Sequence, residues 1–443
     1  MLLLNSFAQM GFSLSVLAQD TTFARGVIRY LCSPECAGRG YNQGIDRAAD
    51  YIAQEMKSMG LKALYAEKYP RNPYTANEFE VSANNFGGNM QVSVNGKMQS
   101  AGDNYLPHPA SKGIKGVFKV KKIAENQLMD EAKFERLLQK KYSSRYALYL
   151  YFTEKNSKAL SDKITRLRQK AIAPVLLRPV FGKLTWHISD SVVPCTEIEL
   201  LSADSLPVPP QKIEVDIDNS QVTNFKTRNL MGIVEGAIQP DTFVVFTAHY
   251  DHLGQLGRDK YIPGANDNAS GVAMLLNLAK HYAAANPKPY YSMAFVAFSA
   301  EELGLVGSQE FAETFAPNPS SPLPQAGFDL SRIKFLVNLD MVGTGDEGIT
   351  VVNATEFGKR FEQLTRLNDE NKYLPQVKAR GKAANSDHYP FYVKGVPCFF
   401  IYTMGGIKAY HDIYDRSQTL PLTRYNDLFT LLTRFVAQLS PVP

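Results

Sequence analysis

Two histidines and an aspartate lie within four residues, directly after an apolar run of the chain. The segment "FVVFTAHYDHLG" carries His249, Asp251 and His252 where a buried strand is expected to end. Imidazole nitrogen and carboxylate oxygen are ligands that Zn²⁺ takes in catalytic sites, so these side chains could bind a metal ion. A solvated strand end is the alternative, and this segment alone does not decide between the two.

Four further segments place acidic or imidazole groups at the ends of apolar runs. The residues are Asp267 in "GANDNASG", Glu301 and Glu302 after "MAFVAFSA", Asp340 after "FLVNL", and His411 shortly after "VPCFFIYT". In sheets of parallel strands, ligands bind beyond the carboxyl ends of the strands, where these side chains would meet. The repeated placement favours one shared site over five separate solvated loop ends.

The candidate ligands are sufficient for two zinc ions. A catalytic zinc ion takes four or five ligands and keeps one position for water, and two ions about 3.5 to 4 Å apart need a bridging carboxylate. His249 and Asp340 would hold one ion, Glu302 and His411 the other, and Asp267 would link them. Co²⁺ or Mn²⁺ could substitute for zinc, because such ligands also bind neighbouring divalent metals.

Three polar neighbours of these ligands are expected to have other roles. Asp251 lies two residues after His249 and is expected to orient its imidazole ring. Glu301 is adjacent to a ligand but points elsewhere, which favours it as the general base that takes a proton from the attacking water. His252 is interpreted as structural or solvated, because His249 already supplies the imidazole at this strand end.

The segments that must position these residues alternate between apolar strands and helical patterns. Strands such as "FVVFTAH" and "IKFLVNLDMVG" alternate with helices such as "SGVAMLLNLAKHYAAA" over residues 226–443, and residues 24–62 are helical. Apolar strands with intervening helices predict an α/β fold, with a mostly parallel central sheet and helices on both faces. We expect residues 21–84 and 226–443 to form this catalytic domain.

Residues 85–225 follow a different pattern. Short alternating strands such as "MQVSVNG" and "GVFKVKKI" surround one basic helical pattern near 158–171, which predicts an inserted β-rich domain. The formal net charge of +5, from 48 basic and 43 acidic residues, is too close to balance to predict a nucleic-acid partner. No apolar run is long enough to predict a transmembrane helix.

The order of the motifs resembles a known peptidase family. "AHYDHLG", "GANDNASGVAMLL", "AFSAEELGLVGSQEF", "NLDMVG", "SDHYPF" and "YHDIYD" are similar to motifs of the zinc metallopeptidases of clan MH, family M28, which include bacterial aminopeptidases. The resemblance is strong over 225–443 and extends to 24–62. It implies a zinc-exopeptidase fold, the five ligands and the base named above, and peptides or small proteins as substrates. The insert at 85–225 could correspond to the protease-associated domain found in this family, although it carries no sharp motif.

The chain departs from the family pattern after the last ligand. Many relatives have "HTPxD" there, whereas this chain has "HDIYD", which leaves the support of His411 open. Asp387 and His388 in "NSDHYPF" resemble a family segment near the active site. A role next to the ligands or against substrate is expected for them, with a structural role as the alternative. Tyr410 could line the pocket or polarise a substrate carbonyl.

The favoured function is that of a dizinc exopeptidase, specifically an aminopeptidase that releases N-terminal residues. A glutaminyl-cyclase-like acyltransferase is less favoured, because its relatives lack the intact segment that "HYD" preserves here. A non-catalytic, receptor-like module is disfavoured because all five ligands and the base are present. Carboxypeptidase or dipeptidase specificity stays open, as do the substrate side chain and the oligomeric state.

The N-terminal segment at 1–20 is expected to direct secretion. It is apolar and carries a small-residue site that suits cleavage after Ala18, although it has no basic residue before Arg25. A disulfide between Cys32 and Cys36 is geometrically possible and would suit a periplasmic or extracellular location.

Secretion predicts a shortened mature chain. Mass spectrometry of the protein from its source should find a first residue near Gln19 or Asp20 outside the cytoplasm. Recovery of intact Met1 from the cytosol would contradict this expectation.

Overall fold

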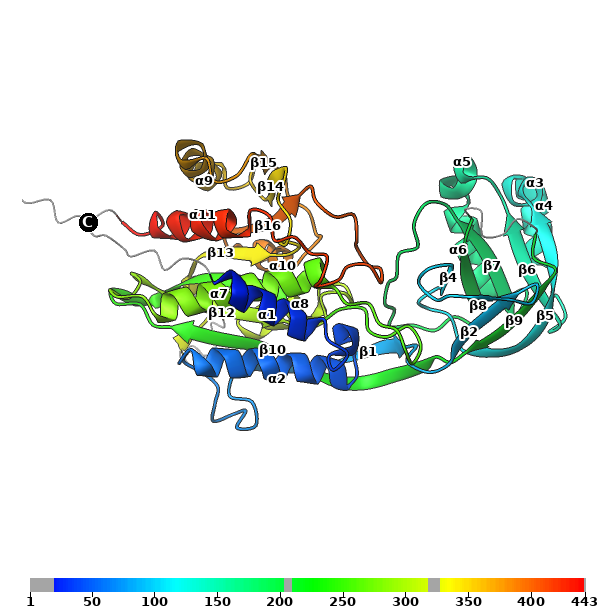
Figure 1. The fold of residues 1–443 in the computed structure, drawn as a ribbon, viewed down its shortest axis with the longest axis horizontal. Helices are drawn as coiled ribbons and strands as arrows, with labels where there is room; N and C mark the ends of the chain where they lie inside the picture. The colour runs from blue at the N-terminus through cyan, green and yellow to red at the C-terminus, as the bar shows by residue number, and fades with distance from the viewer. Residues whose placement is uncertain (1–19, 203–208, 318–326, 442–443) are drawn as a thin grey trace, which may run out of the picture.

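The computed structural model describes residues 20–202, 209–317 and 327–441, which form two lobes (Figure 1). The expected signal segment lies outside the described residues, apart from Asp20. Each lobe is built on an eight-stranded sheet, and the long strands β1 and β10 run between the lobes (Figure 1). No helix among the described residues is long and apolar enough to cross a membrane.

The first lobe contains a mixed sheet with a parallel core. Its strand order is β1-β10-β12-β11-β13-β16-β14-β15. The neighbours β12, β11, β13 and β16 pair in parallel, whereas β10 and β14 join this core in antiparallel register. In sheet order, the strands are Thr75–Asn85 (β1), Ser220–Val234 (β10), Tyr291–Phe298 (β12), Gln239–His249 (β11), Ile333–Leu339 (β13), Cys398–Met404 (β16), Gly348–Val352 (β14) and Val377–Ala379 (β15).

Helices cover both faces of this sheet, as the sequence predicted. α1, α2, α7, α9 and α11 contribute to the apolar core on one face, and α8 and α10 to the core on the other. These helices are Thr21–Leu31 (α1), Gln43–Ser58 (α2), Gly271–Ala283 (α7), Val306–Thr314 (α8), Gly358–Asn371 (α9), His388–Val393 (α10) and Tyr425–Ala437 (α11). Three short helices complete the lobe: Ala37–Arg39 (η1), Ala265–Ser270 (η3) and Leu330–Arg332 (η5).

Burial on both faces explains why the strands read as continuous apolar runs. In β11, Val244 and Phe246 belong to the core on one face, while Phe243 and Val245 belong to the core on the other. Side chains alternate between the faces of a strand, so a strand covered on both sides is apolar over most of its length. In β11 and β13 the buried polar residues Thr247 and Asn338 come near the carboxyl ends, where they hydrogen-bond to each other.

The second lobe contains the other sheet and four helices. Its strand order is β3-β2-β9-β5-β6-β7-β8-β4. The sequence predicted the strands β2, β5, β6 and β9 and the helix α6, but not β4, β7 and β8 or the helices that precede β6. In sheet order, the strands are Lys97–Gln99 (β3), Met90–Val94 (β2), Lys212–Ile217 (β9), Ile114–Ala124 (β5), Tyr146–Tyr151 (β6), Val175–Val180 (β7), Thr196–Leu201 (β8) and Tyr105–Pro107 (β4). The helices are Glu125–Met129 (α3), Glu131–Leu138 (α4), Glu154–Ser157 (α5) and Ser161–Lys170 (α6), and Lys158–Leu160 (η2) joins α5 to α6.

The two lobes share an apolar core. Helices α3, α4 and α6 pack on one face of the second sheet. On its other face, second-lobe residues such as Trp186 pack in one cluster with Leu253, Leu256 and Ile413 of the first lobe. The loops that follow β11 and β16 therefore pack against the second lobe.

The disulfide that the sequence left open is not formed. Cys32 and Cys36 are both free thiols. Cys32 is buried, and burial raises its thiol pKa to about 12. A buried neutral thiol behaves as a small apolar side chain, which is the role of Cys32 in the core beneath α1.

Candidate metal centre

All five candidate ligands lie at the same edge of the first sheet. His249 is the last residue of β11, and Asp340 directly follows β13. Asp267 lies in η3, before α7, while Glu302 and His411 lie in the loops that follow β12 and β16. The parallel core explains the convergence, because its strands all end at one edge.

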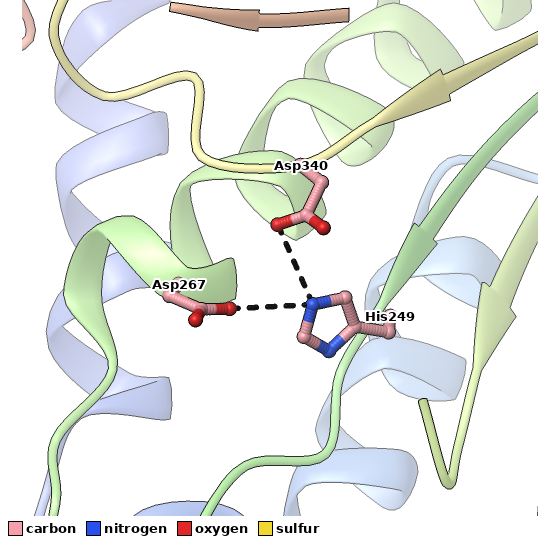
Figure 2. A group of neighbouring side chains, drawn as sticks. All are labelled: His249, Asp267 and Asp340. Carbon is pink, nitrogen blue, oxygen red and sulfur yellow. Dashed lines mark ion pairs between the residues drawn. The ribbon is translucent and has the colours of Figure 1, made fainter. Parts of the chain in front are cut away.

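His249 lies between two aspartates in the first half of the cluster (Figure 2). Its Nε2 is 3.3 Å from Asp267 Oδ1 and 3.5 Å from Asp340 Oδ1. The three side chains are buried, and each offers a ligand atom within 4.8 Å of the others. Asp340 Oδ1 is buried without a hydrogen-bond partner. With only the 3.5 Å ion-pair contact to His249, this buried carboxylate oxygen is costly unless a cation meets it.

The second half of the cluster contains two histidines. His411 Nε2 is 3.0 Å from Asp267 Oδ2 and 3.3 Å from Glu302 Oε2. His252 Nδ1 is 2.7 Å from Glu302 Oε1, and His252, Asp267 and Glu302 also offer ligand atoms within 4.8 Å of one another. His252 is fully buried, which excludes the solvated alternative. The two carboxylate oxygens of Asp267 therefore face different imidazoles, His249 and His411.

The crowding of charges shifts the pKa values of the cluster in opposite directions. Burial raises the pKa of Glu301 well above its usual range, and the charges of Glu302 and Asp387 add to the shift. Burial acts in the same direction on Asp267, but hydrogen bonds with His249 and His411 outweigh it and hold its pKa well below the usual range. Burial disfavours a charged His411, yet Glu302 and Asp267 raise its pKa to about 11. The site thus attracts positive charge strongly.

These residues fit a pair of divalent cations. Imidazole nitrogens and carboxylate oxygens in a dry pocket are the ligand set of catalytic zinc. Asp340 Oδ1, which lacks a hydrogen bond, and Asp267, whose two oxygens face different imidazoles, would give each ion an anionic ligand. A dication near each half would replace the contacts that the imidazolium groups now make.

Asp251 supports the paired glutamates more directly than it supports His249. Its carboxylate accepts hydrogen bonds from the backbone N–H groups of Glu301 and Glu302, both at 3.2 Å, and from the Tyr41 hydroxyl at 2.8 Å. Its Oδ1 is 3.6 Å from His249 Nδ1, and the backbone carbonyl oxygen of Asp251 is 3.3 Å from the same ring nitrogen. Asp251 therefore fixes the turn that separates the two glutamate side chains.

The remaining sequence candidates lie around the cluster in different ways. Asp387 is fully buried, and burial raises its pKa to about 7. His388 begins α10, and its buried ring packs 5.3 Å from the Phe400 ring. Tyr410 is 41% exposed and stacks on the His411 ring at 3.9 Å. Of the three, Tyr410 is thus in direct contact with a candidate ligand and open to solvent.

The comparison with known proteins identifies the family. Residues 229–436 match the family model for Peptidase family M28. This matched region, residues 229–436, belongs to peptidase family M28. The chain is 27% identical over 256 residues to Aminopeptidase YwaD of Bacillus subtilis (strain 168), an alignment that covers 57% of this chain and half the length of that relative.

Solved structures of two aminopeptidases are similar to this chain over almost its whole length. A zinc aminopeptidase from Bacillus subtilis has a TM-score of 0.64 and 18% identity, over 94% of this chain and 95% of that chain. An aminopeptidase from Aneurinibacillus sp. strain AM-1 has a TM-score of 0.61 and 17% identity. This similarity covers 96% of this chain and 97% of that chain. At such identities the similarity shows the fold, and the predicted α/β architecture is confirmed.

Two residues that the sequence analysis did not single out hold the aspartates of this M28 site. Ser386 Oγ donates to Asp340 Oδ2 at 2.9 Å. The Asp415 carboxylate accepts from the backbone N–H groups of Asn266 and Asp267, at 2.9 to 3.0 Å. Asp415 ends the "HDIYD" segment, so this departure from the family pattern keeps a carboxylate on the loop of Asp267.

Arg39 is a third residue whose importance the sequence did not reveal. Its guanidinium is fully buried and donates to five backbone carbonyls, one bond from Nε and two from each terminal nitrogen, which matches its five N–H donors. The acceptors are Leu31, Tyr250, Pro263, Gly264 and Asp267. Arg39 thus ties the N-terminal segment to the loops that carry His249 and Asp267.

Replacing Arg39 should therefore weaken both folding and metal binding. Arg39→Met leaves five buried carbonyls without this donor, so we expect a loss of about 3 kcal/mol or more in the free energy of unfolding. Arg39→Lys, with three donors, should lose less than Arg39→Met. Urea unfolding of chelator-treated protein measures the first effect, and zinc titration of the folded variants measures the second.

Arg47 provides the matched control. It is exposed and donates to the carbonyl of Glu35 from the same N-terminal segment. Arg47→Met should change stability by no more than about 0.5 kcal/mol. Equal stabilities of Arg39→Met and Arg47→Met would show that the buried guanidinium does not hold the site together.

Proposed function

We propose that this chain is an aminopeptidase with two zinc ions. The observation that carries the proposal is the position of Asp267, whose Oδ1 and Oδ2 lie 3.3 Å and 3.0 Å from the imidazoles of His249 and His411. A carboxylate that presents one oxygen to each of two ligand sets is the arrangement that a bridged metal pair requires. His249 and Asp340 would hold one ion, and Glu302 and His411 the other.

The ions and the protein would have separate tasks. When bound, the zinc ions would polarise the scissile carbonyl and lower the pKa of the attacking water. Glu301 takes a proton from that water as the water oxygen bonds to the carbonyl carbon. Glu301 then gives this proton to the leaving nitrogen as the C–N bond breaks. The backbone of Glu301 is fixed by Asp251, so its side chain can act without binding an ion.

The charge of the site supports exopeptidase action at the amino end of a peptide. The cluster contains six carboxyl groups, of which Glu301 and Asp387 are not assigned to an ion and can interact with a substrate amino group. A free α-ammonium group is attracted to such a site, and a free α-carboxylate is repelled. The carboxylates are Asp251, Asp267, Glu301, Glu302, Asp340 and Asp387.

A panel of small substrates tests this function. Aminoacyl anilides with a free amino group should be cleaved, N-acetylated anilides should be cleaved poorly, and chelation should abolish cleavage until zinc is restored. Preference for acetylated dipeptides with a free carboxyl end would indicate a carboxypeptidase. Cyclisation of N-terminal glutamine without anilide cleavage would indicate an acyltransferase, and inactivity on the whole panel would contradict an enzymatic role.

Substitutions of the adjacent residues Glu301 and Glu302 should have different effects on turnover and on metal binding. Glu301→Gln keeps the size of the side chain but cannot accept a proton, so turnover should fall by roughly 10²-fold or more while both ions stay bound. Glu302→Gln removes a charged ligand, so zinc content and activity should fall together, with partial recovery in excess zinc. Metal analysis of both variants beside anilide kinetics provides the measurement.

The reverse pattern would exchange the two assignments. Loss of zinc in Glu301→Gln, with both ions kept in Glu302→Gln, would make Glu301 the ligand. Full activity of both variants would contradict the hydrolytic mechanism.

A further inference from the structure

The second lobe touches the candidate ligand His411 through the backbone of Trp186. The Trp186 carbonyl oxygen is 3.1 Å from His411 Nδ1, and the Trp186 N–H donates to the His411 carbonyl at 2.8 Å. A carbonyl oxygen can only accept, so His411 Nδ1 must carry the proton. This contact leaves Nε2, which faces Asp267 and Glu302, as the ligand atom.

The side chain of Lys183 holds the same loop from a second direction. Its Nζ donates to the carbonyls of Lys408 at 3.0 Å and Tyr410 at 2.8 Å, and it pairs with the Asp412 carboxylate. His411 lies between these acceptors and has a φ of +51°, a left-handed conformation that is uncommon outside glycine. Such a conformation persists only where the surroundings determine it, and Lys183 and Trp186 supply those contacts.

Trp186 is itself fixed at the junction of the lobes. It is 3% exposed, its indole N–H donates to the Leu253 carbonyl at 3.0 Å, and its ring packs edge-on against Phe86. Leu253 lies in the loop after β11, and His249 is the last residue of β11. The junction therefore connects the loops of both halves of the metal centre.

We propose that the second lobe is a positioning element of the metal centre, which holds His411 in place through Trp186 and Lys183. Ion binding at the His411 side and docking of the second lobe are then coupled, and each strengthens the other. The proposal rests on the proposed function, because it requires that His411 binds an ion.

Zinc titration of chelator-stripped protein by calorimetry tests the coupling. Lys183→Met removes the contacts with the loop but leaves Trp186 in place, and it should weaken one of the two binding steps about tenfold or more. The other step should be unchanged. Lys183→Arg, which retains charge and donors, should recover most of the affinity. Trp186→Phe, which loses the hydrogen bond to Leu253, should weaken the same step.

Lys115→Met is the matched control, because Lys115 pairs with Asp216 inside the second lobe and is 79% exposed. It should bind both ions as the wild type does. Trp186 is the sole tryptophan of the chain, so its fluorescence reports on the junction. Zinc should reduce quenching by acrylamide in the wild type and in Lys115→Met, and have less effect in Lys183→Met.

The outcomes separate the two proposals. A wild type that binds no zinc would defeat the proposed function itself. A wild type that binds two ions, with both steps unchanged in Lys183→Met, would overturn only the role of the second lobe. Equal weakening of both steps, together with a lower melting temperature in chelator, would indicate a merely structural contact and would also overturn it.

Discussion

Repulsion between buried carboxylates is the constraint that governs this molecule. The side chains of Asp267, Glu302 and Asp340 meet with little exposure to water, and their neighbours Glu301 and Asp387 have raised pKa values because burial penalises their charges. A fold gains nothing from such a cluster unless positive charge compensates it. Here the imidazoles of His249 and His411 compensate the carboxylates, and dications bound at the site would supply the positive charge in their place.

The scaffold meets this constraint through buried hydrogen bonds that fix the backbone of the segments around the cluster. Arg39 fixes the carbonyls of the ligand loops, Asp251 fixes the turn of the paired glutamates, and Asp415 fixes the backbone of Asp267. Each contact joins segments that are far apart in the chain. The site is therefore held by buried hydrogen bonds to the backbone. These bonds fix the positions from which the ligand side chains extend.

The sequence predicted the parts of the structure that depend on local pattern. Buried strands have apolar runs that end abruptly, so the positions of His249 and Asp340 followed from the runs before them. Contacts between distant segments leave no such pattern. Nothing near Arg39 or Trp186 indicates partners more than 200 positions away, and α4 is a short helix in a highly charged segment. The sequence left His252 as structural or solvated, and only the structure, which buries it beside Glu302 from another strand end, excludes the solvated alternative.

The most direct test of this account is the position of the ions themselves. Crystals of the zinc-loaded protein, measured at the zinc absorption edge, should give two anomalous peaks about 3.5 to 4 Å apart on either side of Asp267. One peak should lie between His249 and Asp340, and the other between Glu302 and His411. A single peak, or a second ion bound by His252 in place of His411, would contradict the account.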